Sequence, residues 1–338
     1  MKRILLINFF TLVLIIFTLE LSARIFKLAN LQGSDNIYKG KYQKSDTGTE
    51  MWQFEMEKGF TEIKPNIKAK VFAKKVFTDS NGFRIPKQNF KYEKEKNSIL
   101  IVGDSVSFGN GVDEENTFVG LLRKKITNIN FFNASVPGHN INANHKKVLL
   151  FKKDFATDKI ILIYTLNDIL DASIIQKTRT NTYGNKNIIK ELLINIIEPI
   201  NRILNSRSFF YLWLRGIIID PGAKNFDYVY KLYQNKENID FLHKKFKDIN
   251  SKIEKELIVL IMPYEMQVRE NCELPIINPQ KKVKSILKNL NIKFIDLTYN
   301  FCNENNSNKL FLKFDPMHLS KKGHGLVYKS LLLEVKNN

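Results

Sequence analysis

The stretch LIVGDSVSFGNGV, from Leu100 to Val112, joins a short apolar run to a polar loop that carries a serine and several glycines. The run from Ile99 to Val102 has the length and the unbroken apolar character of a parallel strand that is buried on both faces. Ser105 follows this run where the chain has to turn. The serine is therefore either a group presented for reaction or a turn residue, and the rest of the chain has to distinguish these roles.

Strand-like and helix-like segments alternate along the chain after this stretch. Further apolar runs that favour buried strands lie at Asn130–Ala134, Lys159–Tyr164, Glu256–Pro263 and Ile292–Leu297. Helical patterns lie at Thr117–Ile126, from Asn140 through Phe151, near Asn238–Lys255, near Pro279–Leu290 and at about Ser320–Val335. This alternation predicts an α/β fold in which about five parallel strands are covered by helices on both faces.

Two segments depart from the alternation. Residues 24–96 are polar and mixed, which predicts a juxtamembrane link and an irregular lead-in, with a plain edge turn at DSNGFRIP, Asp79 to Pro86. Ile188 to Ile219 is rich in isoleucine, leucine and aromatic residues, and predicts helical material inserted near 185–220 into a domain of residues 97–338. This insertion could cover a cleft, contact a membrane or simply pack on the domain, and we favour packing.

The N-terminus has the pattern of an export signal or of a single membrane anchor. Lys2 and Arg3 precede an uncharged apolar run from Ile4 to Leu19. This run falls short of the ~20 residues that span a bilayer unless the following residues contribute. We favour an uncleaved single-pass anchor over residues 1–23, with cleavage near Ser22-Ala23 as the alternative. The basic N-terminus predicts that the remainder lies outside the cytoplasm, in the periplasm or at the cell surface.

The charge and the cysteines narrow the classes of partner. The formal net charge is +19, but the lysines are spread over nearly all segments and no nucleic-acid-binding motif accompanies them. We therefore expect no nucleic-acid partner. Cys272 and Cys302 are the two cysteines, and neither belongs to a Cys-x-x-Cys pair, so a structural zinc site is not expected. Outside the cytoplasm they could form a disulfide, while two isolated thiols are an equally open alternative.

Polar residues follow the carboxyl ends of several predicted strands, where parallel sheets bind their ligands. A serine hydroxyl is a weak nucleophile until a base removes its proton, and the base works best when a third group holds its tautomer. His318 can be the base for Ser105, and Asp315, three residues before it, can be the orienting carboxylate. The backbone N–H groups of Ser105 and Gly138 and the side-chain amide of Asn167 would stabilise an oxyanion.

Four sequence blocks carry these residues, and in this order they resemble the SGNH/GDSL hydrolase family. The blocks are Gly103-Asp104-Ser105 with Gly109, Gly138 within NASVPGHN, Asn167 within TLND, and Asp315-Pro316-Met317-His318. The resemblance spans about Ile99 to Val335. It implies a flavodoxin-like three-layer α/β/α fold and a Ser-His-Asp site that cleaves esters. No cofactor and no metal ion is expected at this site.

The chain departs from the family pattern at two positions that bear on loop geometry. Thr165 stands two residues before the asparagine, where the family often has glycine, and Val106 stands where leucine is frequent after the serine. The N-terminal anchor and DSNGFR also resemble membrane-tethered relatives at bacterial surfaces, some of which act on acylated glycans.

Each site residue also has a purely structural interpretation. Ser105, Asn167 and Asp315 could cap or begin turns, Gly138 could serve a tight turn, and His318 could be a packed surface residue. The joint occurrence of the blocks favours the catalytic roles. We expect Asp104 to organise its loop as a hydrogen-bond acceptor, His139 to lie near the glycine loop without a catalytic role, and His324 to be structural.

Three functions from different classes fit these observations. The first is an exported, membrane-anchored serine esterase that cleaves acyl esters, with O-acetyl groups on a cell-surface glycan as one substrate class. The second is an O-acyltransferase that uses the same triad to acylate a polysaccharide. The third is a noncatalytic surface module that binds a glycan or a protein, and it predicts that Ser105 and His318 lie too far apart for proton transfer.

Overall fold

The computed structural model describes residues 2–31, 51–55, 60–154, 157–169 and 203–336, together with residues 197, 200 and 201. Its centre is an eight-stranded sheet in the order β10-β9-β8-β6-β7-β5-β4-β3. The strands β6 to β10 are parallel, and they span Asn97–Val102, Ile129–Asn133, Lys159–Tyr164, Glu256–Ile261 and Lys293–Asp296. Numbered by sequence, these five strands have the order 2-1-3-4-5, which is flavodoxin-like. The five predicted parallel strands are confirmed.

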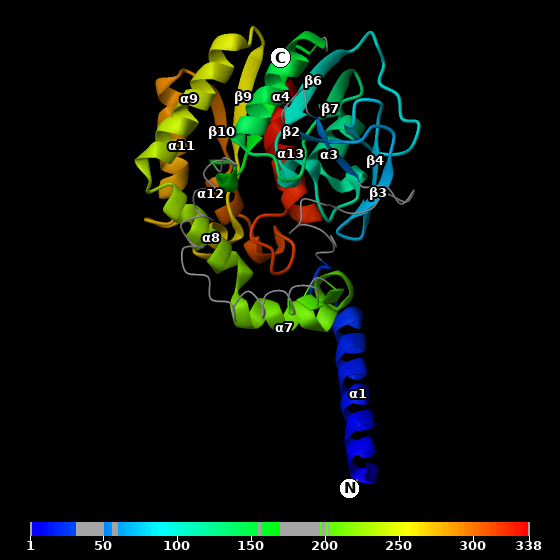
Figure 1. Ribbon diagram of the computed structural model, residues 1–338. Helices are drawn as coiled ribbons and strands as arrows, with labels where there is room; N and C mark the ends of the chain where they lie inside the picture. The colour runs from blue at the N-terminus through cyan, green and yellow to red at the C-terminus, as the bar shows by residue number, and fades with distance from the viewer. Residues whose placement is uncertain are drawn as a thin grey trace.

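Helices cover both faces of this sheet and complete three layers (Figure 1). Leu100 and Val102 face a core formed with α4, α8, α9 and α11, which span Ile141–Asp154, Pro221–Leu232, Lys236–Lys252 and Asn278–Asn289. Ile99 and Ile101 face the opposite core, formed with α3, α10, α12 and α13, which span Phe118–Lys125, Glu265–Arg269, Thr298–Cys302 and Lys321–Lys336. The parallel strands are apolar throughout because both of their faces are buried.

Local capping explains where two of the predicted helices begin. The Thr117 hydroxyl accepts a hydrogen bond from the Gly120 N–H at 3.1 Å and starts α3. The Asn140 side chain accepts from the N–H groups of Asn142 and Ala143, both at 3.1 Å, and starts α4. These side chains satisfy amide groups that have no partner within the helix. The two helix starts agree with the sequence prediction.

The prediction of an irregular lead-in over residues 24–96 is wrong for much of that segment. Strands β3, β4 and β5, at Lys68–Val71, Lys74–Thr78 and Arg84–Ile85, pair antiparallel and extend the sheet beyond β7. The strands β1 and β2, at Trp52–Glu55 and Phe60–Ile63, form a separate antiparallel pair. Strands of two to five residues are too short to show a sustained period in sequence, and those of the sheet owe their place to pairing with a neighbouring strand.

The predicted turn at Asp79–Pro86 is present, but it is not a plain edge turn. The Asp79 carboxylate accepts hydrogen bonds from the N–H groups of Asn81 and Phe83, at 2.8 and 2.9 Å, and Gly82 has a φ of 76°. The turn leads directly into β5, which lies inside the sheet between β4 and β7. Arg84 is completely buried there.

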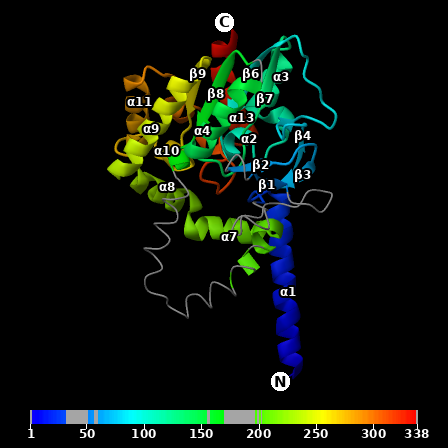
Figure 2. The same cartoon turned by 45° about the horizontal axis from the view of Figure 1, so that its top comes forward.

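The N-terminal helix α1, Lys2–Ile25, is long and apolar enough to cross a membrane, and its apolar side chains are exposed. It projects away from the three-layer body, and the helix α7, Phe209–Ile219, lies across its C-terminal end in both views (Figures 1 and 2). The predicted insertion is thus helical where it is described. Its residues 185–196, 198, 199 and 202 lie outside the described residues.

The two cysteines form a disulfide between Cys272 and Cys302, with a Cα–Cα distance of 6.2 Å. Cys272 lies just beyond α10, and Cys302 is the last residue of α12. The disulfide therefore links the connections that follow β9 and β10, and the alternative of two isolated thiols is wrong.

Candidate active site

Ser105 stands at the point where β6 turns into the short helix α2, Ser105–Phe108. The Asp104 carboxylate caps this helix, because its Oδ1 accepts from the Val106 N–H at 2.9 Å. Gly103 has no room for a side chain, since a Cβ atom there would lie 2.3 Å from Ser107 Oγ and 2.9 Å from the Ile163 carbonyl oxygen. The strand and its capped turn hold the Ser105 hydroxyl at the carboxyl edge of the sheet.

His318 connects Ser105 to Asp315 through both of its ring nitrogens. Its Nε2 lies 2.8 Å from Ser105 Oγ, and its Nδ1 lies 2.8 and 2.9 Å from the two carboxylate oxygens of Asp315. The same carboxylate accepts from the backbone N–H groups of Met317 and His318, at 3.0 and 2.7 Å. This tight turn holds the carboxylate against Nδ1, so Nδ1 carries a proton and Nε2 is free to accept one from the serine.

The surroundings of His318 favour its protonated form. Burial by itself would lower the pKa of the imidazole, but the negative charge and the hydrogen bond of Asp315, with a further contribution from Asp104, raise the pKa above its usual value. An imidazole in this setting accepts a proton more readily than a free one. The arrangement can therefore perform general acid–base chemistry on a group bound at Ser105.

The three residues predicted to donate to an oxyanion lie after β6, β7 and β8, at the same edge of the sheet. Ser105 and Asn167 are partly exposed and Gly138 is exposed, whereas their immediate neighbours in sequence are mostly buried. Gly138 has a φ of 86°, and its loop is tied to the residue after β6 by a hydrogen bond from the Val136 N–H to the Gly103 carbonyl at 3.0 Å. Asn167 lies in the 3-10 helix η3, Leu166–Ile169, directly after β8.

Thr165 links two of the four sequence blocks. Its hydroxyl lies 2.9 Å from Asp104 Oδ2 and 2.7 Å from Asn167 Oδ1. Burial raises the pKa of Asp104, while hydrogen bonds from Val106, Thr165 and Asn167 act in the opposite direction. Asp104 thus organises its loop as the sequence predicted. The departure at Thr165 supplies a hydroxyl to this network that a glycine could not supply.

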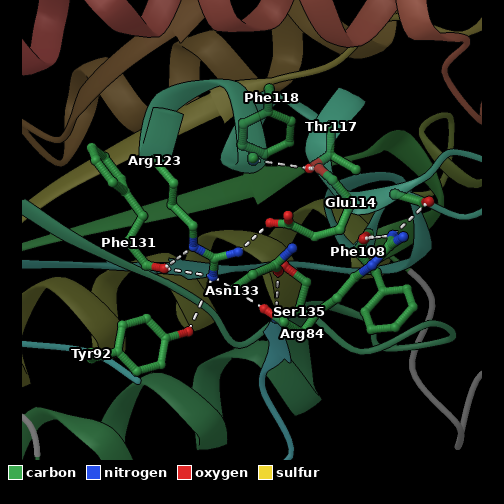
Figure 3. A network of polar contacts seen from close by, with 12 residues as sticks. Arg84, Tyr92, Phe108, Glu114, Thr117, Phe118, Arg123, Phe131, Asn133 and Ser135 are labelled. Atoms are coloured by element: carbon green, nitrogen blue, oxygen red, sulfur yellow. Dashed lines mark hydrogen bonds and ion pairs between the residues drawn. The ribbon is translucent and has the colours of Figure 1, made fainter. Parts of the chain in front are cut away.

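Arg84 is a positioning residue that the sequence did not reveal. Its guanidinium donates to the carbonyl oxygens of Phe108, Gly109 and Val112, at 2.5, 2.7 and 2.6 Å, and so holds the segment that follows α2 (Figure 3). Burial lowers the pKa of Arg84 to about 10. An arginine within a predicted edge turn would be expected to face solvent, and only the position of β5 inside the sheet directs it inward.

A second arginine, Arg123, contacts the backbone of Arg84 and extends the polar network around it. Arg123 on α3 forms an ion pair with Glu114 and donates to the carbonyl oxygens of Arg84 and Phe131, at 3.1 and 2.7 Å (Figure 3). It also donates to the Tyr92 hydroxyl at 3.1 Å. The network ties β5, β7 and the loop after α2 into one unit beside the candidate site.

Phe72 contacts the candidate base from the β3–β4 hairpin. Its ring meets the His318 ring edge to face, with 5.2 Å between the ring centroids. Phe72 and Ala73 form the two-residue turn of this hairpin, and both have positive φ, 49° and 61°. A two-residue turn of this kind matches the twist of the strands, although it is unfavourable for phenylalanine. The lead-in that seemed irregular in sequence therefore reaches the site.

The other two histidines singled out in the sequence lie in protein-filled surroundings. His139 is buried, and its Nε2 donates to the Thr61 carbonyl at 2.6 Å. His324 is buried, stacks on Phe118 and accepts from the Phe118 N–H at 3.4 Å. Burial is the main cause that lowers the pKa of each to about 3, so both are neutral at pH 7.

Comparisons with known proteins give similar structures only. No family profile matches the sequence, and no curated protein matches it either. Among solved structures, a lipolytic G-D-S-L family member from Veillonella parvula is 18% identical, with a TM-score of 0.41, and the match covers 70% of this chain and 96% of that one. A lipase/acylhydrolase from Enterococcus faecalis is 13% identical, with a TM-score of 0.44 and coverages of 71% and 96%.

An acetylxylan esterase from Geobacillus stearothermophilus is 16% identical, with a TM-score of 0.40 and coverages of 72% and 96%. Five parallel strands in flavodoxin-like order, with helices on both faces, form a flavodoxin-like three-layer α/β/α fold, and the four sequence blocks lie at its carboxyl edge.

Proposed function

We propose that this protein is a membrane-anchored serine ester hydrolase in which Ser105 is the nucleophile, His318 the acid and base, and Asp315 the residue that orients His318. The observation that carries the proposal is the continuous hydrogen-bonded chain from Ser105 Oγ through both ring nitrogens of His318 to the Asp315 carboxylate. Its geometry meets the requirement that a serine nucleophile needs a base within hydrogen-bond reach.

The proposed reaction has two steps, acylation of Ser105 and hydrolysis of the acyl-serine. Ser105 Oγ attacks the ester carbonyl carbon while its proton passes to His318 Nε2, and the imidazolium then gives that proton to the leaving alcohol as the ester C–O bond breaks. Water attacks the resulting acyl-serine, gives its proton to Nε2, and the carboxylic acid leaves as Ser105 regains a proton. The N–H groups of Ser105 and Gly138 and the Asn167 amide would stabilise both oxyanions.

The proposed location is outside the cytoplasm, with α1 as an uncleaved anchor. The length and hydropathy of α1 support the anchor. The disulfide between Cys272 and Cys302 supports an oxidising compartment, because disulfides are rare in proteins of the cytosol. The proposed substrate is an acyl ester, with acylated carbohydrate at the cell surface as the class that the resemblance to membrane-tethered relatives suggests.

The contact between Ser105 and His318 argues against a noncatalytic binding module. That hypothesis required the two side chains to be too far apart for proton transfer, whereas their reactive atoms lie 2.8 Å apart. Acyl transfer to a glycan would use the same residues, because an acyl-serine can be resolved by a sugar hydroxyl as well as by water. The experiment therefore includes a carbohydrate acceptor.

The test uses the full chain in detergent micelles, assayed with aryl acetates and with longer acyl esters. Ser105→Ala should abolish ester cleavage and labelling by a fluorophosphonate, while Ser251→Ala, at an exposed serine near the end of α9, should retain both. Labelling of Ser105→Ala at the normal rate would refute the nucleophile. If an added polysaccharide becomes acylated, the protein is an acyltransferase and the proposal of hydrolysis is wrong.

A further inference from the structure

The exposed apolar side chains outside α1 gather around one short helix. Among the described residues, Leu214, Ile217, Ile218 and Ile219 of α7 are exposed, and so are Ile197, Ile200 and Ile203 before it. The other exposed large apolar side chains outside α1 are Phe26, directly after that helix, and single residues on separate parts of the body, Leu150, Tyr228, Leu274, Tyr299 and Leu333. Several exposed apolar residues on one short helix mark a candidate interaction surface, whereas single exposed apolar residues are ordinary.

Three of the exposed residues form one face of α7, and the opposite face packs on the protein, while the exposed Ile219 is the last residue of the helix. Leu214, Ile217 and Ile218 follow the helical spacing of i, i+3 and i+4. Ile218 is 71% exposed and Ile217 is 57% exposed, whereas Leu212 and Gly216 on the other side are buried. Almost every residue of α7 is apolar, so the face that does not pack on the protein exposes apolar side chains.

The C-terminal end of α1 holds the N-terminus of α7. The Glu20 carboxylate accepts from the N–H groups of Phe209 and Phe210, at 3.1 and 3.0 Å, and from the Ser208 hydroxyl at 2.7 Å. Arg24 forms an ion pair with Glu20 at 2.7 Å and lies over the Phe209 ring. The carboxylate satisfies amide groups that a helix N-terminus leaves without partners, and it favours the positive end of the helix dipole.

This attachment sets the level of α7 relative to α1. The uncharged apolar run of α1 ends at Leu19, and Glu20 and Arg24 follow within the next two turns. Charged residues at this place in a membrane span lie at the boundary between hydrocarbon and water. Since α7 begins at these residues and runs across the end of α1, it lies at the same boundary (Figures 1 and 2).

The residues that flank the exposed face suit a membrane interface. Trp213 and Tyr211 are partly buried on α7, and aromatic side chains of this kind are enriched at the level of lipid head groups. Arg207 precedes the helix and is exposed, and Arg24 lies beside Phe209. Basic side chains next to an apolar face are attracted by anionic lipids.

We propose that α7 lies in the surface of the bilayer that α1 enters, with Leu214, Ile217 and Ile218 inserted among the lipids. The occupant of this face is lipid because the face continues, at the same level, the apolar surface of α1. The inference rests on the membrane anchoring in the proposed function. It revises the expectation that this segment only packs on the domain.

The docking also places the candidate active site at the membrane. Gly216 lies against the ring of Phe314, because a Cβ atom at Gly216 would come within 2.2 Å of that ring. Phe314 directly precedes Asp315, so α7 supports the turn that carries the orienting carboxylate and His318. In Figure 1, the loop that contains these residues lies between the sheet and α7. The site then faces esters presented at the bilayer surface.

The test measures the depth of single spin labels on the full chain in vesicles of phosphatidylcholine and phosphatidylglycerol. Both native cysteines are in the disulfide, so an introduced cysteine supplies the one free thiol. Labels at Ile218→Cys and at Leu214→Cys report on the face of α7. Leu12→Cys reports on α1, and Leu333→Cys is the matched control, an exposed leucine in the last turn of α13, whose end lies opposite α1 (Figure 1).

Collisions with oxygen, which dissolves in lipid, are compared with collisions with a nickel chelate, which stays in water. We expect oxygen collisions to exceed nickel collisions at positions 218, 214 and 12, and the ratio to reverse at position 333. The docking of α7 would be wrong if the labels at 218 and 214 were as accessible to nickel as the label at 333, or were protected from both reagents. A label at 12 that is still exposed to lipid would then continue to support the anchor. Nickel access at 12 as well would overturn both.

Discussion

The hydroxyl of Thr165 lies 2.9 Å from the buried carboxylate of Asp104, the residue that caps the turn carrying Ser105. It also lies 2.7 Å from the side chain of Asn167, which is proposed to donate to the oxyanion. Thr165 stands where the SGNH/GDSL family, which the sequence resembles, often has glycine, and it connects the block that carries Ser105 to the block that carries Asn167. The connection makes a specific demand on activity.

Thr165→Val should lower kcat with little effect on KM. Valine keeps the shape of threonine but removes the hydroxyl, so Asn167 loses a contact that orients its amide toward the reacting oxygen. Loss of one oxyanion donor costs about 10²- to 10³-fold, and misplacement of a donor should cost less, on the order of tenfold. Steady-state kinetics with an aryl acetate measure this. Thr165→Ser should restore the rate, and a valine variant as active as the native protein would contradict the role.

Asp315→Asn should lower kcat by up to about 10⁴-fold, since an amide favours the wrong tautomer of the histidine. It should also move the acid side of the pH–rate profile. His318 must be neutral to act as a base, so the rate rises with pH through its pKa, which Asp315 raises. Without that carboxylate, burial remains the stronger cause and the rise should occur at a lower pH. Asp227→Asn, at an exposed carboxylate on α8, should leave the profile unchanged.

Arg84→Met should destabilise the fold and lower activity together. The carbonyl oxygens of Phe108 and Val112 lose the arginine donor, whereas that of Gly109 keeps the Val112 N–H at 3.2 Å. Because each unsatisfied group costs about 1–3 kcal/mol, we expect the free energy of unfolding, measured by denaturant titration, to fall by roughly 2 kcal/mol or more. Lys87→Met removes a charge from an exposed site nearby and serves as the control. Equal stability of the two variants would show that Arg84 does not hold the loop after α2.

Reduction of the disulfide should lower the free energy of unfolding, and replacement of both cysteines should have the same effect. The bridge joins residues 30 apart in sequence, and closure of a loop of this size stabilises a protein by about 3–4 kcal/mol. The double variant Cys272→Ser with Cys302→Ser should unfold at a lower denaturant concentration than the native protein. It should also lose the response to reductant. A native protein that unfolds identically with and without reductant would contradict the bridge.

The sequence by itself determined the parallel core and named the residues of the candidate site. Buried strands such as Lys159–Tyr164 and capped helix starts such as Asn140 are patterns of a few neighbouring residues, and they survive in any environment that supplies a core. The residues of the four blocks could be assigned to one site because the carboxyl ends of parallel strands meet at one edge of the sheet.

Only the tertiary structure decided which distant segments support that edge. The antiparallel strands β3 to β5, the inward direction of Arg84, the contact of Phe72 with His318 and the disulfide all depend on pairing across the chain. The attachment of α7 to Glu20 likewise depends on residues separated by 189 positions. Such contacts have no local period, because their free energy comes from burial and hydrogen bonds that exist only after the chain has folded.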